Sequence, residues 1–139
     1  MCDIETVDRA FGLSNEERMI NTMSLILKTK LTKISDKWST FDAKNHDSSV
    51  FVEIKTRRCK STDFDTTIVG INKIREARRQ YKLGNKVYFV FSFSDDNYYW
   101  EYTEEPNHYE VRCGGRGDRG SGEWKTYAYI YTDKLRIIM

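Results

Sequence analysis

The fold of this chain is decided by the run VFVEIKT, Val50 to Thr56, together with Asp42, eleven residues before the glutamate of that run. Side chains alternate between the two faces of a β-strand, which places Glu53 and Lys55 on the same face. The segment Asn45–Ser48 has the composition of a turn. We therefore expect a hairpin in which Asp42 lies directly across from Glu53 or one diagonal step away, on the same face.

Two carboxylates that face each other across a hairpin carry an electrostatic cost. Like charges opposite each other destabilise a sheet, so Asp42 and Glu53 need a neutralising partner. A divalent cation supplies it, and carboxylate oxygens suit Mg²⁺ or Mn²⁺, which usually also take waters and a phosphate oxygen. The alternative is a surface hairpin on which Glu53 and Lys55 are ordinary solvated residues.

The composition is that of one globular domain covering residues 1–139. Aromatic residues make up 14% and hydrophobic residues 39% of the chain, which excludes a disordered protein. The net charge is +2, so a nucleic-acid surface has to come from local clusters of basic residues. Three cysteines without C-x-x-C spacing predict a reduced, intracellular protein without a zinc site. Because no apolar run approaches the roughly 20 residues of a membrane span, we expect a soluble protein without a membrane partner.

The two histidines offer little support for histidine-dependent catalysis. His46 and His108 fall in expected loops or strand edges. A histidine in a turn is most often solvated, so neither is assigned a catalytic role.

Hydrophobic periodicity predicts two helices and six strands. Residues 1–12 are expected to be irregular, and Ser14 and Glu17, spaced as a capping box, to open a helix that ends near Lys33. After the polar segment 60–67, a second helix is expected from Ile68 to the stop at Gly84-Asn85. Strands are expected over 36–44, 49–57, 87–93, 98–103, 109–113 and 125–131. The order α-β-β-α-β-β-β-β suits a mixed β-sheet flanked by helices.

One glutamate of the first helix is spaced to face the sheet. Glu16 lies three, four and seven residues before apolar residues of the helical stripe, so it points the same way. Glu17 points away and is explained by capping. A carboxylate aimed at a sheet needs a partner, so we favour Glu16 as an assisting site residue. The alternative is a first-turn glutamate that complements the helix dipole.

The hairpin resembles the core of the PD-(D/E)XK nuclease superfamily, in which one strand carries an acidic residue and the next carries E-x-K. The resemblance covers roughly residues 13–102 in element order, with Phe41 standing where the family has its proline. It implies a restriction-endonuclease-like α/β fold in which Asp42 and Glu53 bind the catalytic metal and the Ile54 carbonyl is a third ligand. It also implies that a first-helix glutamate helps to hold the metal through water.

These features predict a Mg²⁺- or Mn²⁺-dependent nuclease that hydrolyses phosphodiester bonds in DNA, with RNA left open. The reaction needs a Lewis acid, an activated water and relief of the charge that builds on the phosphate. In the resembled family the lysine of E-x-K, here Lys55, orients or deprotonates the water and stabilises that charge. The small size of the chain favours structure-selective or partner-directed endonucleolytic cleavage by a homodimer of viral or phage origin.

Two other functions stay open. The chain could be a non-catalytic member of the same fold that binds nucleic acid or serves in an assembly. It could also be a protein–protein module without a nucleic-acid role, which predicts neither DNA binding nor cleavage.

Basic residues predict where nucleic acid would lie. Arg57 and Arg58 leave the hairpin, and the second helix has a cationic face that either contacts phosphates or is simply solvated. The glycine-rich stretch 113–122 is expected to be a loop whose two arginines touch the nucleic-acid backbone, or a plain connector. The residues expected to bind nucleic acid are Arg57, Arg58, Lys60, Lys73, Arg78, Arg116 and Arg119.

Overall fold

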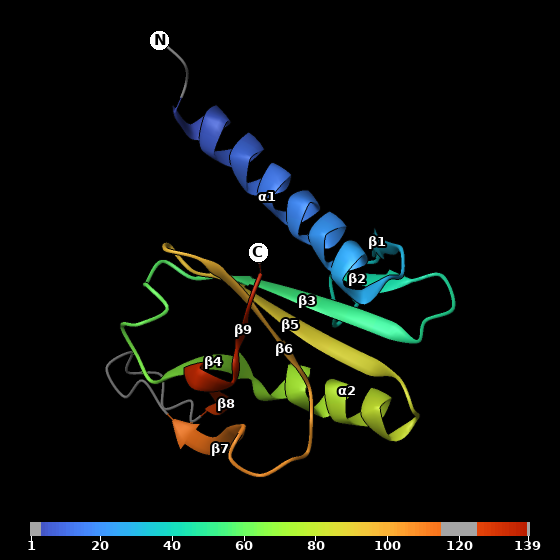
Figure 1. Cartoon of the computed structure of the whole chain (residues 1–139), viewed down its shortest axis with the longest axis vertical. Helices are drawn as coiled ribbons and strands as arrows, with labels where there is room; N and C mark the ends of the chain where they lie inside the picture. Colours follow the sequence, from blue (N-terminus) through green and yellow to red (C-terminus); the bar gives the residue numbers. More distant parts are fainter. Residues whose placement is uncertain (1–3, 115–124, 139) are drawn as a thin grey trace.

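The structure, a computed structural model, describes residues 4–114 and 125–138 (Figure 1). The elements of these residues, in chain order, are α1 (Ile4–Leu27), β1 (Leu31–Lys33), β2 (Ala43–Asn45), β3 (Val50–Thr56), β4 (Thr66–Gly70), α2 (Ile71–Lys82), β5 (Lys86–Ser92), β6 (Asn97–Glu101), β7 (Tyr109–Gly114), β8 (Lys125–Tyr131), the 3-10 turn η2 (Thr132–Lys134) and β9 (Arg136–Ile137).

Six strands form the main sheet, in the order β1-β2-β3-β5-β6-β9. β3 and β5 run parallel, and the other neighbouring pairs are antiparallel. In the parallel register Glu53 lies beside Phe89 and Lys55 beside Phe91. β5 is buried from Val87 to its end, as expected of a strand covered on both faces. The β2–β3 hairpin is therefore held against the most buried strand of the sheet.

The main sheet is covered on both sides (Figure 1). α1 lies on one face, where Met23 packs in a cluster with Val52 and Val90. α2 lies on the other face together with a small antiparallel sheet of order β4-β8-β7, and here Ile74 packs in a cluster with Phe89. Successive residues of β3 and β5 thus point into two separate apolar layers, as the pleat of a strand requires.

α2 follows β4 without an intervening loop. Gly70 joins them, and a Cβ at this position would lie 2.7 Å from Asn72 Oδ1, so a larger residue would require the Asn72 side chain to move. β4 is held in turn by β8, with Val69 opposite Ala128. This junction fixes the position of the first turn of α2, which carries Lys73.

The first helix differs from the expected helix at both ends. It begins at Ile4, so the expected irregular stretch 1–12 is largely helical, and the capping-box pattern that starts at Ser14 lies inside the helix. It ends at Leu27 and not near Lys33, because Lys28 adopts a left-handed φ of 56° that stops the helix. Leu31, which falls within the expected helix, begins β1 and is buried there.

The expected strand 36–44 is wrong. β1 and β2 form an antiparallel pair joined by a loop, because local polar contacts replace the strand ladder there. In that loop Asp36 Oδ1 accepts a hydrogen bond from the Trp38 backbone N–H at 3.0 Å, and the Asp36 carbonyl accepts one from the Ser39 N–H at 3.1 Å. The pairing of β2 with β3 nevertheless forms the expected hairpin.

The region around residue 68 also differs from the prediction. Ile68 lies in β4 and α2 begins at Ile71; in β4 it is Thr67 and Val69 that are buried, which is the period of a strand. β4, β7 and β8 form a second sheet instead of extending the first, and β9 was not expected. The mixed α/β class is confirmed, whereas the predicted element order and single sheet are wrong. Within the described ranges, neither helix combines the length and apolar character that crossing a membrane requires.

Candidate active site

Asp42 and Glu53 meet at the point where β2 ends and β3 continues. The register pairs Ala43 with Val52, which places Asp42 opposite Glu53. The Asp42 backbone N–H donates to the Val52 carbonyl at 3.0 Å, and the Asp42 carboxylate accepts a hydrogen bond from the Ile54 N–H at 2.7 Å. The hairpin therefore brings the two carboxyl groups together, in the closer of the two arrangements that the sequence allowed.

Glu53 is a buried carboxyl group, with 3% of its surface exposed. Burial raises the pKa of Glu53 to about 7, the neighbouring Asp42 carboxyl adds to the rise, and the Lys73 ammonium opposes it. Desolvation disfavours the charged form of a carboxyl group, and a second carboxyl group beside it acts in the same direction. Around neutral pH the Asp42–Glu53 pair can therefore take up either a proton or a cation.

Lys73 of α2 reaches this pair from the other layer of the protein. Its Nζ lies 2.7 Å from Glu53 Oε2, and it also donates to the carbonyl of Thr40 in the loop before β2. Within the described residues, Glu53 Oε2 accepts no hydrogen bond of ordinary geometry, so the contact with Lys73 is mainly electrostatic. The sequence predicted Lys73 to bind nucleic acid, and the structure brings it to the carboxylates.

Lys55 lies two residues beyond Glu53 on the same face of β3 and is half-buried. Its charge lowers the pKa of Glu53, although less than the contact with Lys73 does. Among residues 4–114 and 125–138, Lys55 has no hydrogen-bond or ion-pair partner. Its ammonium is therefore available to a ligand, in contrast to that of Lys73.

A cavity of about 230 Å³ opens beside Asp42. It is lined by Asn15, Glu16, Asp42, Ile54 and Thr56. Glu16 lines it while pairing with Lys33 at 3.6 Å, whereas Glu17 is exposed. α1 thus places the glutamate that helical spacing favoured in the wall of the cavity that Asp42 also lines, whereas Glu53 does not line it.

The oxygen atoms at this place fit a hard divalent cation. In a β-strand the N–H and C=O of one residue point to the same edge, so the Ile54 carbonyl points to the side where its N–H meets Asp42. Two carboxyl groups and a carbonyl suit Mg²⁺ or Mn²⁺, which complete their shells with waters and substrate oxygens. Among the described residues, no three or more His, Cys, Asp or Glu side chains form a group that could hold a metal ion, so the site offers only this carboxyl pair and the carbonyl.

The predicted nucleic-acid contacts are dispersed. Arg57 is half-buried and donates from Nη2 to the carbonyl of Ile68, which ties the end of β3 to β4; burial lowers its pKa. Arg58 and Lys60 are exposed at the end of β3, and Arg78 pairs with Glu104 at 3.2 Å on the exposed side of α2. Arg116 and Arg119 lie outside the described residues.

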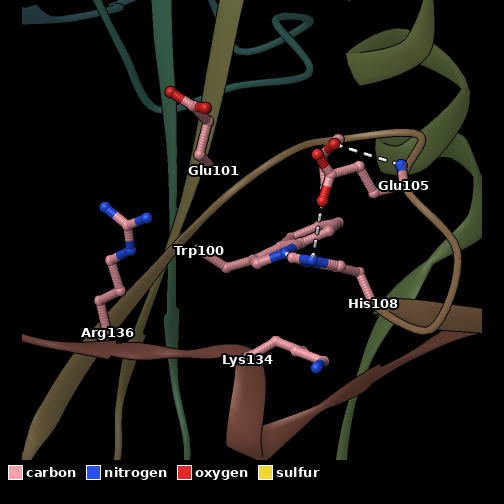
Figure 2. Close-up of a pocket in the computed structure, with 7 residues that line it drawn as sticks. Trp100, Glu101, Glu105, His108, Lys134 and Arg136 are labelled. Carbon is pink, nitrogen blue, oxygen red and sulfur yellow. Dashed lines mark hydrogen bonds and ion pairs between the residues drawn. The ribbon is translucent and has the colours of Figure 1, made fainter.

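A second cavity, of about 200 Å³, lies beside β6 and the β8–β9 connection (Figure 2). Figure 2 shows the ring of His108 beside the indole of Trp100, with Glu105 on one side and Lys134 on the other. Trp100 Nε1 donates to His108 Nδ1 at 3.1 Å, and His108 Nε2 lies 3.7 Å from Glu105. None of the predicted site residues lines this cavity, and its histidine serves a buried tryptophan.

Sequence reasoning missed two contributors to the carboxylate site. The Thr40 carbonyl binds Lys73, and Asn15 lines the cavity while its side-chain amide donates to Ser92 Oγ at 3.4 Å. A backbone carbonyl carries no sequence signal. Asn15 directly precedes Glu16 on the same helix, and this neighbouring position was the sequence signal that could have indicated it.

A parallel β3–β5 pair, an antiparallel β2 and an Asp/Glu-x-Lys set at their junction define the class of α/β proteins with a PD-(D/E)XK-type core. Over residues 6–132 the chain matches the model of the family described as "Phage putative PDDEXK endonuclease", and it belongs to this family. The resemblance to the PD-(D/E)XK superfamily is thereby confirmed, and a nuclease of phage type is supported at the level of the family. Comparisons with curated proteins and with solved structures found no match.

Proposed function

We propose that this protein is a Mg²⁺-dependent endonuclease that hydrolyses phosphodiester bonds in DNA. The observation that carries the proposal is the convergence of the Asp42 and Glu53 carboxyl groups at one end of the β2–β3 hairpin, with Glu53 buried. Burying a carboxylate beside a second one is costly, and a fold retains such an arrangement where the charge has a use.

In this proposal the carboxylate oxygens of Asp42 and Glu53 and the carbonyl of Ile54 would hold Mg²⁺, and Glu16, in the wall of the cavity, would assist through water. When bound, the metal ion acts as a Lewis acid on the phosphate oxygens and lowers the pKa of water. The hydrogen bond from the Ile54 N–H orients the Asp42 carboxylate toward the same place. β3, which carries Glu53 and Lys55, is paired on both sides, by β2 and by β5.

Lys55 and Lys73 have different roles in this proposal. Lys55 Nζ, free of partners in the described part of the chain, orients the attacking water and faces the charge that develops on the phosphate. Lys73 Nζ holds Glu53 in place and connects it to the Thr40 carbonyl. Lys73 is a positioning residue, since its contacts are with the carboxylate and the backbone.

The test is metal-dependent nicking of supercoiled plasmid DNA, with Mg²⁺ or Mn²⁺, by the wild-type protein and by Asp42→Asn and Lys55→Met. Nicking by the wild type that both variants lose supports the site. Nicking that persists in both variants removes the assignment of these residues, and nicking that survives removal of divalent ions by EDTA removes the metal.

The Lys73–Glu53 contact also favours a second candidate, a non-catalytic protein of the same fold that binds nucleic acid. A lysine that neutralises the carboxylate can replace the metal, as an ion pair needs no further cation. Calorimetric titration with Mg²⁺ separates the two candidates. Binding of Mg²⁺ to the wild type supports the nuclease. Binding of Mg²⁺ to Lys73→Gln but not to the wild type shows that Lys73 occupies the cation site in the wild type.

The finer features of the reaction belong to this proposal as well. The basic residues at the end of β3 and on the outside of α2, namely Arg58, Lys60 and Arg78, would contact the DNA backbone near the site. Because the chain is small, cleavage would be selective for DNA structure or directed by a partner. A homodimer would cut both strands of a duplex. Sedimentation of the protein with and without DNA can test whether the dimer forms.

A further inference from the structure

Trp38 stands out because it is a large aromatic side chain that the fold leaves in solvent. It is 83% exposed, whereas Trp100 of the core is 2% exposed. It lies in the loop between β1 and β2, four residues before Asp42. Aromatic side chains usually contribute most to stability by burial, so this one stabilises the folded state little by its own packing.

The exposure of Trp38 is imposed by a well-anchored turn. Its backbone N–H donates to Asp36 Oδ1 at 3.0 Å, and the Ser39 N–H closes the turn on the Asp36 carbonyl at 3.1 Å. Ser39 Oγ donates to the Phe41 carbonyl at 2.9 Å, and Phe41 is buried with its ring 5.5 Å from that of Phe51. The turn is therefore tied to the core beyond Trp38, and the indole is held on the outside.

The same loop reaches the carboxylate site. The Thr40 carbonyl accepts a hydrogen bond from Lys73, which pairs with Glu53. Four residues of chain span at most about 14 Å, so the indole lies within a few nucleotide steps of a phosphate bound at Asp42. Lys37 Nζ lies 5.3 Å from the centre of the Trp38 ring, which places a cation beside the aromatic face. An aromatic ring with an adjacent cation matches a nucleobase with its phosphate.

We propose that Trp38 is a stacking platform for an unpaired base next to the scissile phosphate, so that the substrate is DNA with single-stranded or unpaired nucleotides. The inference rests on the proposed function and names the substrate class of the same site. In a continuous duplex both faces of each base are covered by neighbouring bases, so a base can stack on a side chain only where it is unpaired or displaced. A protein partner is the competing occupant of an exposed tryptophan.

The test measures DNA binding without cleavage, in EDTA, by fluorescence anisotropy. The probes are an oligothymidylate of about 15 nucleotides and a fully paired duplex of the same length. The variants are Trp38→Ala and Trp38→Phe, with Leu83→Ala as the matched control. Leu83 is 64% exposed and comes directly after the last residue of α2. Lys73 lies near the first residue of this helix, roughly 15 Å away along the helix axis.

Stacking of one base is worth enough that Trp38→Ala should weaken binding of the oligothymidylate about 10-fold. Trp38→Phe should lose less, Leu83→Ala should bind like the wild type, and duplex binding should change less than about twofold in every variant. The oligothymidylate should also quench tryptophan emission in the wild type, and Trp38→Phe should lose that quenching.

Other results overturn the inference in distinguishable ways. Wild-type binding to DNA that Trp38→Ala leaves unchanged removes the stacking role while the proposed function stands. Equal weakening on both probes shows a backbone contact without selection for unpaired bases. Absence of binding by the wild type to either probe removes the stacking inference, while metal-dependent plasmid nicking decides separately whether the proposed function stands. A change in oligomeric state in Trp38→Ala, seen by sedimentation, assigns the indole to a protein contact.

Discussion

Ionisable side chains gather at two places on the main sheet, and their surroundings differ. At the β2–β3 junction, Asp42 and Glu53 meet with a buried carboxyl group whose pKa is raised to about 7. At the edge of β6, His108 accepts a hydrogen bond from the buried indole of Trp100, so its Nδ1 is already occupied (Figure 2). Both places have a cavity of similar size. The comparison teaches that a buried carboxyl group beside a second one, and not a cavity with polar walls, marks the candidate active site.

The largest difference between the two places should appear in catalysis. Asp42→Asn removes a proposed metal ligand and Lys55→Met removes the cation proposed to face the charge on the phosphate, so plasmid nicking should fall at least about 100-fold in each. Lys134→Ala, on the wall of the other cavity, should nick like the wild type. Initial rates of conversion of supercoiled to open-circular DNA give the comparison. Comparable losses in all three variants would show that the two places are not functionally distinct.

The next largest effect is the pH dependence of stability in metal-free protein. Because the pKa of Glu53 is raised from 4.5 to about 7, the folded state holds a proton that the unfolded state has lost. The contribution of Glu53 is therefore fully present below pH 4.5 and is lost as pH rises to about 7, a difference of about 3 kcal/mol in the free energy of unfolding.

Urea unfolding in EDTA at pH 5 and pH 8 measures this difference. Glu53→Gln cannot titrate, so it should lose this part of the pH dependence and be the more stable protein at pH 8. A wild type and a variant with parallel pH profiles would contradict the raised pKa.

A smaller effect is expected from Lys73. Lys73→Met leaves Glu53 buried without its cation, and the free energy of unfolding at pH 8 in EDTA should fall by about 2 kcal/mol, less than for a fully buried pair because Lys73 is partly exposed. Lys73→Arg keeps the charge and should recover part of the loss. Unfolding in urea checks both. An unchanged stability in Lys73→Met would show that the ion pair with Glu53 does not hold the site together.

The smallest effect should come from the second of these places, at the edge of β6. His108→Ala leaves the buried indole N–H of Trp100 without an acceptor, which should cost about 1–2 kcal/mol in the free energy of unfolding. Plasmid nicking should be unchanged. Glu105→Ala, which removes a 3.7 Å contact of an exposed side chain with the same histidine, is the control and should unfold like the wild type. A loss of nicking in His108→Ala would make this second cavity part of the active site.

Most of the longer strands and the end of α2 could be predicted from the sequence, whereas β1, β4, β9 and the bounds of α1 could not. β3 and β8 lie where alternation placed them, because the period of two is a local property of an extended chain. α1 extends to Ile4 and stops at Lys28 because of a left-handed backbone at that residue, which apolar spacing does not show. Ile68 had the spacing of a helix and yet lies in β4, since pairing with β8 decided its conformation.

The candidate site, too, could be predicted only where it depends on residues that are close in the sequence. The register of one hairpin brings Asp42 to Glu53, and eleven residues of sequence are enough to suggest it. The Lys73 contact joins α2 to β3 across 20 residues and depends on how the helix packs on the sheet. The roles of Asp42, Glu53, Lys55 and Glu16 in metal binding and catalysis remain predictions, which the experiments above address.

The sequence by itself determined the alternation of β3, the acidic pair with its lysine on one face, and membership in the family described as "Phage putative PDDEXK endonuclease". Tertiary structure alone decided that Glu53 is buried, that Lys73 is its cation, that Glu16 and not Glu17 lines the cavity, and that Trp38 remains in solvent. The physical reason is the distance along the chain over which each effect acts. Backbone geometry imposes a period on neighbouring residues, whereas burial and charge pairing arise only when packed helices and sheets bring distant residues into contact.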